Sequence, residues 1–325
     1  SLHDALPIYG KHLYNKCLLS LEKSSIFKEM EIIIVDDGST EKETLEVIQR
    51  IERKYPNVKT YCFGDGGSGS ASRPRNKGVE LANTDYITFL DPDNEAVNDG
   101  YAKLFQEIKE NDIDMVVGNI VKIGEKEIEL NYSNSVYSID ATGYIYDTKQ
   151  FLIDTNLKAQ SIQALIVKKE IIKKNNLKMV VGAAGQDTLF FQQLLLHSEK
   201  VKAIPTIIHL YYSEVSNSVT NLITKRFFEK YLILERERIK FLKENDLLNH
   251  YVNKRLQTYF KGWYLVRVPR LMRTDYEEAV NILNEIYKIY KPYIKYKFEP
   301  FSKLEKAIKD KEHGKFVEYC IELIK

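Results

Sequence analysis

Apolar residues along the first two thirds of the chain follow two alternating patterns. Short segments rich in apolar residues occur at 31–35, 58–63, 86–90 and 115–121, and residues 32–35 form an uninterrupted apolar run. Before the first of these segments, apolar residues recur at helical spacing, at Leu13, Cys17 and Leu21. Uninterrupted apolar runs are typical of strands covered on both faces, as in a parallel sheet. The pattern therefore predicts an α/β domain with a mainly parallel sheet and helices on its faces.

The pattern changes twice further along the chain. It weakens at 122–160, then predicts strands at 162–167 and 203–212 with a helix at 186–197 between them. From residue 222 onward glycine almost disappears, and long helical patterns fill the chain, at 222–247, 249–266, 275–290 and 302–324. We therefore predict two domains, an α/β domain over 1–221 and a helical region over 222–325.

Composition places the chain among ordinary globular proteins. It has 325 residues, of which 44% are hydrophobic and 29% charged, and its net charge is +2. The charge is unevenly distributed along the sequence: residues 1–221 carry a net charge of −6, and residues 222–325 carry +8. The basic region is either a set of solvated helix faces or a surface that meets an anionic polymer or membrane.

The cysteines and the absence of long apolar runs bear on location. Cys17, Cys62 and Cys320 are far apart in sequence and lie among apolar residues, so they predict buried thiols in a reducing compartment. No apolar run approaches the length of about 18 residues that spans a bilayer. We expect a cytoplasmic protein without a transmembrane segment, with a peripheral place at the inner face of the membrane as an alternative.

Acidic residues follow two of the predicted strands directly. In open α/β sheets ligands bind at the carboxyl ends of the strands, and here one strand ends in Asp36-Asp37-Gly38-Ser39. A carboxylate at this position can accept hydrogen bonds from a nucleobase or a ribose. Aspartate, glycine and serine also favour turns and helix caps, so both roles stay open for Asp36 and Asp37.

The second acidic motif, Asp91-Pro92-Asp93, follows the run at 86–90. Residues i and i+2 of an extended segment point to the same side, and Pro92 holds Asp91 extended. Two carboxylates facing one small volume repel each other and favour a cation between them. Mg²⁺ or Mn²⁺ suits such oxygen ligands and would bridge to phosphate. The motif predicts a metal site, with an acidic turn as the alternative.

Three further segments carry candidate chemistry. The glycine-rich loop 64–70 lacks the Gly-Lys-Ser/Thr ending of a P-loop, but the helix after it opens with Arg73-Pro74-Arg75-Asn76, which favours anions. A flexible loop before a basic helix start explains these residues equally well. Asp187 is either a helix N-cap or a general base at a cleft edge. His209 is more typical of an ordinary strand residue than of a ligand.

Taken together, these residues resemble family 2 glycosyltransferases with the GT-A fold. The resemblance covers about residues 7–221 and rests on motifs that occur in the family's order. These are Glu31–Ser39, the stretch Arg75-Asn76-Lys77-Gly78, the strand with Asp91-Pro92-Asp93, Gly185-Gln186-Asp187, and Tyr211-Tyr212 followed by Ser218-Val219-Thr220.

The resemblance implies an inverting transfer of sugar from a nucleotide-sugar donor, usually a UDP-sugar. It implies that Asp187 is the general base and that Asp93, with Asp91, holds Mn²⁺ or Mg²⁺. His209 is the candidate for a third metal ligand. The residues implied in nucleotide-sugar binding are Pro7, Tyr9, Asp36, Asp37, Arg75, Asn76 and Asp91.

The stretch 70–78 is most similar to wall teichoic acid sugar transferases. This similarity implies a bacterial surface polymer or glycan as acceptor, and the basic region 222–325 suits an anionic one. We expect no nucleic-acid partner, and the helical region is a candidate acceptor or homo-oligomer contact.

The chain departs from the family's pattern at two places. Pro7-Ile8-Tyr9 is retained with Gly10 in the asparagine position, but Ser1–Leu6 is a poor strand where the family has an apolar one, and Gln186 replaces a glutamate. Two alternatives therefore stay open. One is a nucleotidyltransferase that makes a sugar nucleotide, and the other is a non-catalytic, transferase-like protein that binds a polymer.

Overall fold

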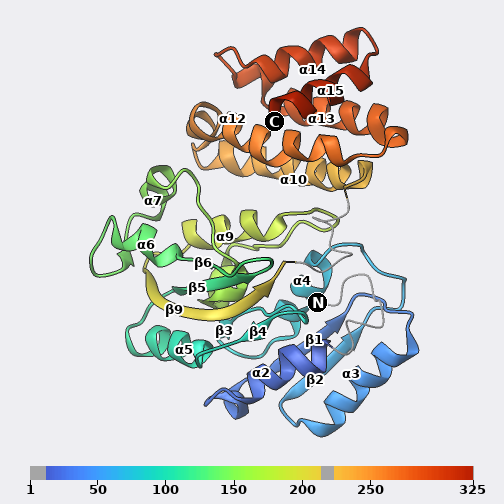
Figure 1. Ribbon diagram of the computed structural model, residues 1–325. Coiled ribbons are helices and arrows are strands. Elements are labelled where there is room, and N and C mark those ends of the chain that lie inside the picture. The colour runs from blue at the N-terminus through green and yellow to red at the C-terminus, as the bar shows by residue number, and fades with distance from the viewer. Residues whose placement is uncertain (1–11, 214–222, 325) are drawn as a thin grey trace. The chain divides into compact units, whose positions relative to one another are not determined.

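The structure is a computed structural model, and it describes residues 12–213 and 223–324. Within this range the chain forms two compact units (Figure 1). The first consists of residues 12–182 with 186–213, and the second of 183–185 with 223–324. The predicted domain boundary at 221 falls between the described ranges, so it stays a prediction.

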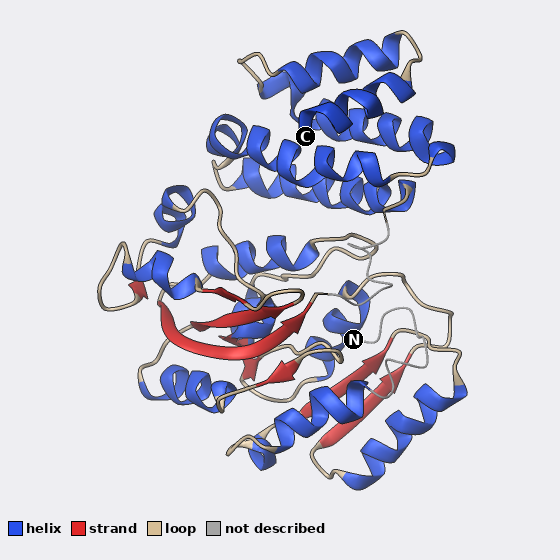
Figure 2. Ribbon diagram, viewed as in Figure 1, coloured by secondary structure: helices blue, strands red, loops and turns tan. Residues whose placement is uncertain are grey.

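The described residues of the first unit form two sheets (Figure 2). Strands β1 (Ile32–Asp36) and β2 (Val58–Cys62) form a parallel pair. The larger sheet has the order β3-β8-β5-β9-β4, with β6 paired to β5 and β7 to β9. Its strands are β3 (Tyr86–Ile87), β4 (Glu95–Ala96), β5 (Met115–Ile123), β6 (Ile128–Leu130), β7 (Tyr144–Ile145), β8 (Leu165–Lys168) and β9 (Val201–Tyr212).

The α/β class is confirmed, but the expectation of a mainly parallel sheet is wrong for the larger sheet. Among the strands that the structure describes in that sheet, only β5 and β9 pair in parallel, whereas β3–β8, β8–β5 and β9–β4 pair antiparallel. The apolar run Met115–Ile123 is buried over most of its length, as the pattern predicts. Such a run reports that a strand is covered on both faces, and it carries no information about the direction of its neighbours.

Helices cover both sides of the larger sheet. Helix α5 (Gly100–Glu110) contacts β5, β8 and β9, and α6 (Tyr132–Tyr137) contacts β5 and β9, on the opposite side in Figure 1. The core beneath α5 combines Tyr101, Leu104 and Ile108 with alternate residues of the strands. The other helices of this unit are η1 (Leu13–Leu18), α2 (Leu19–Glu22), η2 (Phe27–Glu29), α3 (Lys42–Lys54), α4 (Ser72–Leu81), α7 (Thr148–Asp154), η3 (Ile162–Ala164), α8 (Lys169–Lys174) and α9 (Gln186–Leu196).

The second unit is helical throughout its described part. Its long helices α10 (Lys225–Glu244) and α13 (Tyr276–Tyr290) pack against each other, and α14 (Glu299–Lys309) and α15 (His313–Ile324) pack against α13. A run of short helical segments fills the chain between α10 and α13. These are α11 (Leu248–His250), η4 (Tyr251–Arg255), α12 (Leu256–Tyr259), η5 (Phe260–Tyr264), η6 (Leu265–Arg270) and η7 (Arg273–Asp275), and η8 (Lys291–Tyr293) follows α13.

No helix within 12–213 or 223–324 is both long enough and apolar enough to cross a membrane.

Candidate active site

The acidic turn after β1 is held by its own carboxylates. The Asp36 carboxylate is fully buried and accepts hydrogen bonds from the main-chain N–H groups of Gly38 (3.1 Å) and Ser39 (2.8 Å). Asp37 is also buried, and its Oδ2 accepts from the N–H and the hydroxyl of Ser68, both at 2.8 Å. Both aspartates therefore shape the local backbone, and their predicted role in nucleotide binding stays a prediction.

Two glycines let this turn lie against the glycine-rich loop. Gly38 has φ +94°, and a Cβ built on it would come within 2.6 Å of the Gly67 nitrogen. Gly67 has φ +89°, and its Cβ would come within 3.0 Å of the Asp37 carbonyl oxygen. Arg73 joins the same parts through Nε to Asp37 (2.7 Å) and Nη1 to Asp65 (2.6 Å). The glycine-rich loop is therefore held against the end of β1 by close backbone packing and by the ion pairs of Arg73.

The buried Arg75 and the partly buried Asp91 form an ion pair at the next strand end. Nη2 of Arg75, on α4, donates to both carboxylate oxygens of Asp91, at 2.6 and 2.8 Å. Gln163 adds two bonds, because its Nε2 donates to Oδ2 of Asp91 (2.9 Å) and its Oε1 accepts from the Asp91 N–H (2.8 Å). The Asp91 carboxylate is thus compensated in charge and in hydrogen bonds.

Asp93 lies in a different electrostatic environment from Asp91. Burial, and then the charge of Asp91, raise the pKa of the Asp93 carboxyl from its ordinary value of 3.8 to about 6. Lys16 opposes this shift only in part, and no ion pair to Asp93 is formed by the residues that the structure describes. A half-buried carboxylate beside another carboxylate is a place where a cation is favoured.

Asp187 belongs to the same electrostatic cluster. Burial alone would lower the pKa of the Arg75 guanidinium, but the charges of Asp91, Asp187 and Asp93 outweigh it and raise that pKa. Burial raises the pKa of the Tyr211 hydroxyl, and the same three carboxylates raise it further. The structure therefore brings the two acids of the strand-end motif and the predicted base together around Arg75 and Tyr211.

His209 lies on β9, opposite Ala96 of β4, and has no exposed surface. Burial lowers the pKa of His209 to about 4, while the Leu210 main chain and the charge of Asp91 oppose the shift. Neither ring nitrogen has a well-formed hydrogen bond to the described residues. The imidazole is therefore neutral at pH 7 and keeps a lone pair.

The amino end of α4 is joined to the segment that precedes α9. The Asn76 side chain donates to the Met179 carbonyl (2.8 Å) and accepts from the Met179 N–H (2.9 Å). Ser72 donates to the Val180 carbonyl (2.6 Å), and Ser70 accepts from the Gly182 N–H (2.8 Å). Asn76, predicted to bind the nucleotide, thus uses its amide to hold this segment, and its role with the ligand stays a prediction.

The residues suit a divalent cation that takes part of its coordination from a diphosphate. Asp93 supplies an under-compensated carboxylate, and magnesium sites commonly combine one or two carboxylates with substrate phosphates. Within the described residues, no group of three or more His, Cys, Asp or Glu side chains is arranged to hold a metal by itself. Asp91, Asp93 and His209 therefore do not form a ready-made three-ligand site.

Sequence reasoning missed Gln163 and Asn94. Gln163 is buried and bonds Asp91 and also Asn94, whose Nδ2 donates to Oε1 of Gln163 (2.8 Å). The only signal in the sequence is a glutamine next to the apolar run of β8, which indicates a polar contact without its partner. Pro7, Tyr9 and the stretch 218–220 lie outside the described residues.

These features define a class of protein: an α/β fold that gathers acidic groups and an arginine at strand ends beside a glycine-rich loop. The family model for glycosyl transferase family 2 matches residues 7–175. This match covers more than half of the chain, so the chain belongs to glycosyl transferase family 2 and is a glycosyltransferase. The family assignment gives no support to the nucleotidyltransferase or the non-catalytic alternative.

Individual relatives agree with this assignment. The chain is 25% identical over 253 residues to the uncharacterized glycosyltransferase YibD of Escherichia coli, which covers 77% of this chain and 71% of that protein. It is 25% identical over 293 residues to the poly(ribitol-phosphate) beta-N-acetylglucosaminyltransferase TarP of Staphylococcus aureus, which covers 86% of this chain and 84% of that protein.

A solved structure supports the fold. The crystal structure of S. aureus TarS 1-349 in complex with UDP-GlcNAc matches with a TM-score of 0.64 at 15% sequence identity. The match covers 93% of this chain and 89% of that one. The GT-A-like fold predicted from the motifs is therefore confirmed.

Proposed function

We propose that this glycosyltransferase moves a sugar from a UDP-sugar to a hydroxyl group of an anionic bacterial surface polymer of the poly(ribitol phosphate) type, with inversion at the anomeric carbon. The observation that carries the proposal is the cluster of Asp91, Asp93 and Asp187 around Arg75. The poly(ribitol phosphate) for which TarP is named and the UDP-GlcNAc bound to TarS support the choice of acceptor and donor.

In the proposed reaction, the carboxylate of Asp187 takes the proton of the acceptor hydroxyl. The acceptor oxygen then forms a bond to the anomeric carbon while the bond from that carbon to the diphosphate oxygen breaks, and its electron pair leaves with UDP. A positioned base of this kind contributes about 10²–10⁴-fold to the rate. Because Asp187 acts on one face of the sugar and the diphosphate leaves from the other, the product has inverted configuration.

Arg75 and Asp91 have a positioning role in the proposal. Arg75 holds Asp91 through two short contacts, so the edge of the site toward the ribose is already formed before the donor binds. Asp93, with Asp91, would hold Mn²⁺ or Mg²⁺, and His209 is a candidate for a further ligand. When bound, such a cation supplies positive charge next to the diphosphate.

The charge of the helical region supports the choice of acceptor, and the free cysteines support the cellular location. The basic excess of 222–325 suits a phosphate-rich polymer. Cys17, Cys62 and Cys320 form no disulfide, which is consistent with the reducing cytoplasm. A homo-oligomer remains a further expectation for the helical unit.

The proposal is tested with the full chain, UDP-GlcNAc or UDP-glucose, Mn²⁺, and poly(ribitol phosphate) as acceptor. We expect release of UDP that increases with polymer concentration, and we expect polymer-bound sugar with a β-linkage by NMR. A neutral glycan of similar length serves as the control acceptor. Equal transfer to both acceptors would contradict the anionic acceptor, and an α-linked product from the α-configured donor would contradict inversion.

A further inference from the structure

The ladder between β3 and β8 is short. It pairs Tyr86 with Lys168 and Ile87 with Val167, although the apolar run at 86–90 predicts a longer strand. The acidic turn 91–94 comes after this run, so no regular pairing between β3 and β4 fixes the turn to the sheet within the described residues. Side chains take the place of the ladder there.

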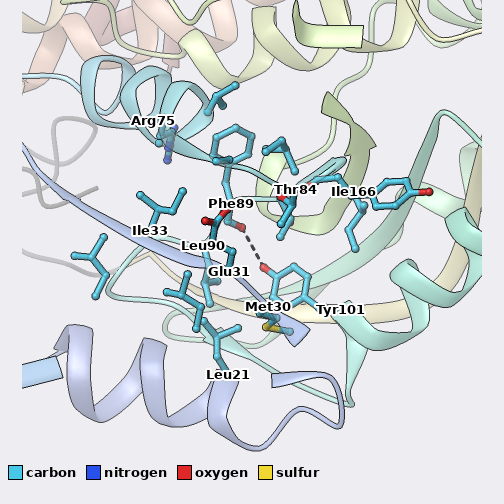
Figure 3. Close-up of a pocket in the computed structure, with 18 of the residues that line it drawn as sticks. Leu21, Met30, Glu31, Ile33, Arg75, Thr84, Phe89, Leu90, Tyr101 and Ile166 are labelled. Carbon is cyan, nitrogen blue, oxygen red and sulfur yellow. Dashed lines mark hydrogen bonds between the residues drawn. The ribbon is translucent and has the colours of Figure 1, made fainter. Parts of the chain in front are cut away.

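Two hydroxyl groups attach the first part of this segment to the chain before β8. Thr88 Oγ1 donates to the Leu165 carbonyl (2.6 Å). The Tyr101 hydroxyl donates to the Phe89 carbonyl (3.1 Å) and to the Gln163 carbonyl (2.8 Å). Figure 3, a close-up of the cavity that this segment lines, marks the bond to Phe89. The main chain of Gln163 is thereby held beside the segment that leads to the acidic turn.

The carboxamide of Gln163 attaches the turn itself. Its Oε1 accepts from the Asp91 N–H (2.8 Å) and from Nδ2 of Asn94 (2.8 Å). Because both of these groups are donors, the other end of the amide is the one that faces Asp91, and Nε2 donates to Oδ2 of Asp91 (2.9 Å). One side chain therefore fixes both the main chain and the carboxylate of Asp91.

Asn94 extends these bonds to β9. Its N–H donates to the Asp91 carbonyl (3.1 Å) and closes the turn, and its Oδ1 accepts from the Tyr212 N–H (3.2 Å). Gln163 is 6% exposed and Asn94 1%. Burying an amide costs free energy unless the amide is hydrogen-bonded. The two amides thus form a buried network that joins η3, the acidic turn and the end of β9.

We propose that Gln163 is a positioning residue of the donor site, which fixes the turn 91–94 so that Asp91 and Asp93 are held in place for the diphosphate and its cation. An apolar side chain of the same size would fill the place of Gln163, but it would leave the Asp91 N–H and the Asn94 amide without their bonds. The proposal rests on the proposed function, in which Asp91 and Asp93 hold the cation, and it adds a residue that acts through Asp91.

The role of Gln163 differs from that of Arg75. Arg75 balances the charge of Asp91 from α4, whereas Gln163 bonds the main chain as well as the carboxylate. Replacing a side chain that orients a metal-binding carboxylate typically weakens metal binding or activity by about 10–100-fold. We therefore expect the loss of Gln163 to weaken the binding of the donor nucleotide with its cation.

The test is Gln163→Met in the full chain, because methionine keeps the length of the side chain and removes its hydrogen bonds. Calorimetric titration with UDP in the presence of Mn²⁺ should give a Kd about 10–100-fold above that of the parent. The titration contains no acceptor, so an error in the proposed acceptor would not alter its outcome. Thermal unfolding of the same samples measures the Tm.

Gln192→Met is the matched control. Gln192 is buried in the same unit and donates to the Leu157 carbonyl (2.7 Å). Its replacement should lower the Tm but leave the Kd for UDP with Mn²⁺ within about twofold of the parent value. Gln163→Met made in an Asp91→Asn background should raise that Kd by less than about threefold further, because Gln163 acts through Asp91.

Tyr101→Phe provides a second variant, should Gln163→Met fail to fold. It keeps the ring and removes only the hydroxyl that holds the main chain of Gln163, and it should raise the Kd about threefold or more. If the folded variants have a lower Tm and a parent-like Kd, Gln163 is a structural residue and the proposal is overturned. Parent-like UDP binding by Asp91→Asn would overturn the proposal together with the role of Asp91 on which it rests.

Discussion

The two units each contain a cluster of buried charges, and the clusters differ in how completely they are compensated. In the helical unit Glu235 is fully buried and accepts from Arg238, from the Tyr264 hydroxyl and from the Tyr290 hydroxyl, each at 2.5 Å. In the α/β unit Asp93 has a raised pKa and the described residues form no ion pair with it.

This difference separates a structural role from a functional one. A buried carboxylate whose charge and hydrogen bonds are all satisfied by protein groups has no free oxygen lone pair for a ligand. Removing that carboxylate leaves its buried partner charge uncompensated. A carboxylate that the protein leaves under-compensated destabilises the fold and attracts a cation. We therefore interpret Glu235 as a residue that fixes the packing of the helices, and Asp93 as a residue kept for binding.

The largest effect is expected at the proposed base. Asp187→Asn should lower kcat by about 10²–10⁴-fold, because the amide cannot take a proton, while UDP binding and Tm stay near those of the parent. Steady-state transfer kinetics measure kcat, and calorimetry measures UDP binding and Tm. Asp154→Asn, on the exposed side of α7, is the matched control, and a parent-like kcat for Asp187→Asn would remove Asp187 from the mechanism.

Replacing Glu235, in the compensated cluster of the helical unit, should change the stability of the protein alone. Glu235→Ala should lower the free energy of unfolding by about 3–5 kcal/mol, because the buried Arg238 loses its counter-charge. Denaturant titration of the full chain measures this loss. Glu237→Ala on the same helix breaks only an exposed pair with Lys240 and should cost less than about 1 kcal/mol. Equal losses from both variants would contradict the contrast between the clusters.

Replacing the under-compensated carboxylate of Asp93 should raise the stability of the protein, in contrast to replacing Glu235. The pKa of Asp93 is raised to about 6 from 3.8, so its stabilising contribution is present below pH 4 and is lost as the pH rises through 6. Asp93→Asn should therefore raise stability by about 2–3 kcal/mol at pH 8 and by almost nothing at pH 4.

Binding measurements on the same variant complete the test of Asp93. Mn²⁺-dependent UDP binding by the parent should weaken as the pH falls through 6, and Asp93→Asn should lack the Mn²⁺-dependent part at every pH. Calorimetric titrations of UDP with and without Mn²⁺ measure both. If Asp93→Asn is less stable than the parent at pH 8, Asp93 belongs with Glu235 as a structural residue.

The smallest effect is expected at the turn that fastens the glycine-rich loop. Gly38→Ala should cost about 1–3 kcal/mol, because φ is +94° and the new Cβ would meet the Gly67 nitrogen. Gly64→Ala is the control, since a Cβ there meets nothing within 4 Å. Thermal unfolding of the two variants distinguishes them, and equal Tm values would show that the loop adjusts freely.

The sequence predicted the positions of most helices and strands because burial leaves a periodic trace. The helical spacing before β1 corresponds to η1 and α2, and the pattern at 275–290 corresponds to α13. The single helix expected at 302–324 is two helices, because Lys311 adopts φ +55° between them.

The sequence predicted which acidic residues belong to the candidate site, but it did not predict which residues bond to them. Acids after apolar runs could be recognised because strand ends are where ligands bind. The pairing of Arg75 with Asp91 joins residues 16 positions apart, and that of Gln163 with Asp91 joins residues 72 positions apart. Such contacts depend on the order and direction of strands, which apolar runs do not encode.

The bonds between the start of α4 and residues 179–182 have a consequence for how the enzyme moves. Asn76 and Met179 are 103 positions apart in sequence, yet they are tied by two hydrogen bonds, next to Arg75 on one side and a few residues before Asp187 on the other. Because these bonds join the start of α4 to the segment before α9, we expect a substitution at Asn76 to change the position of Arg75 relative to the proposed base Asp187.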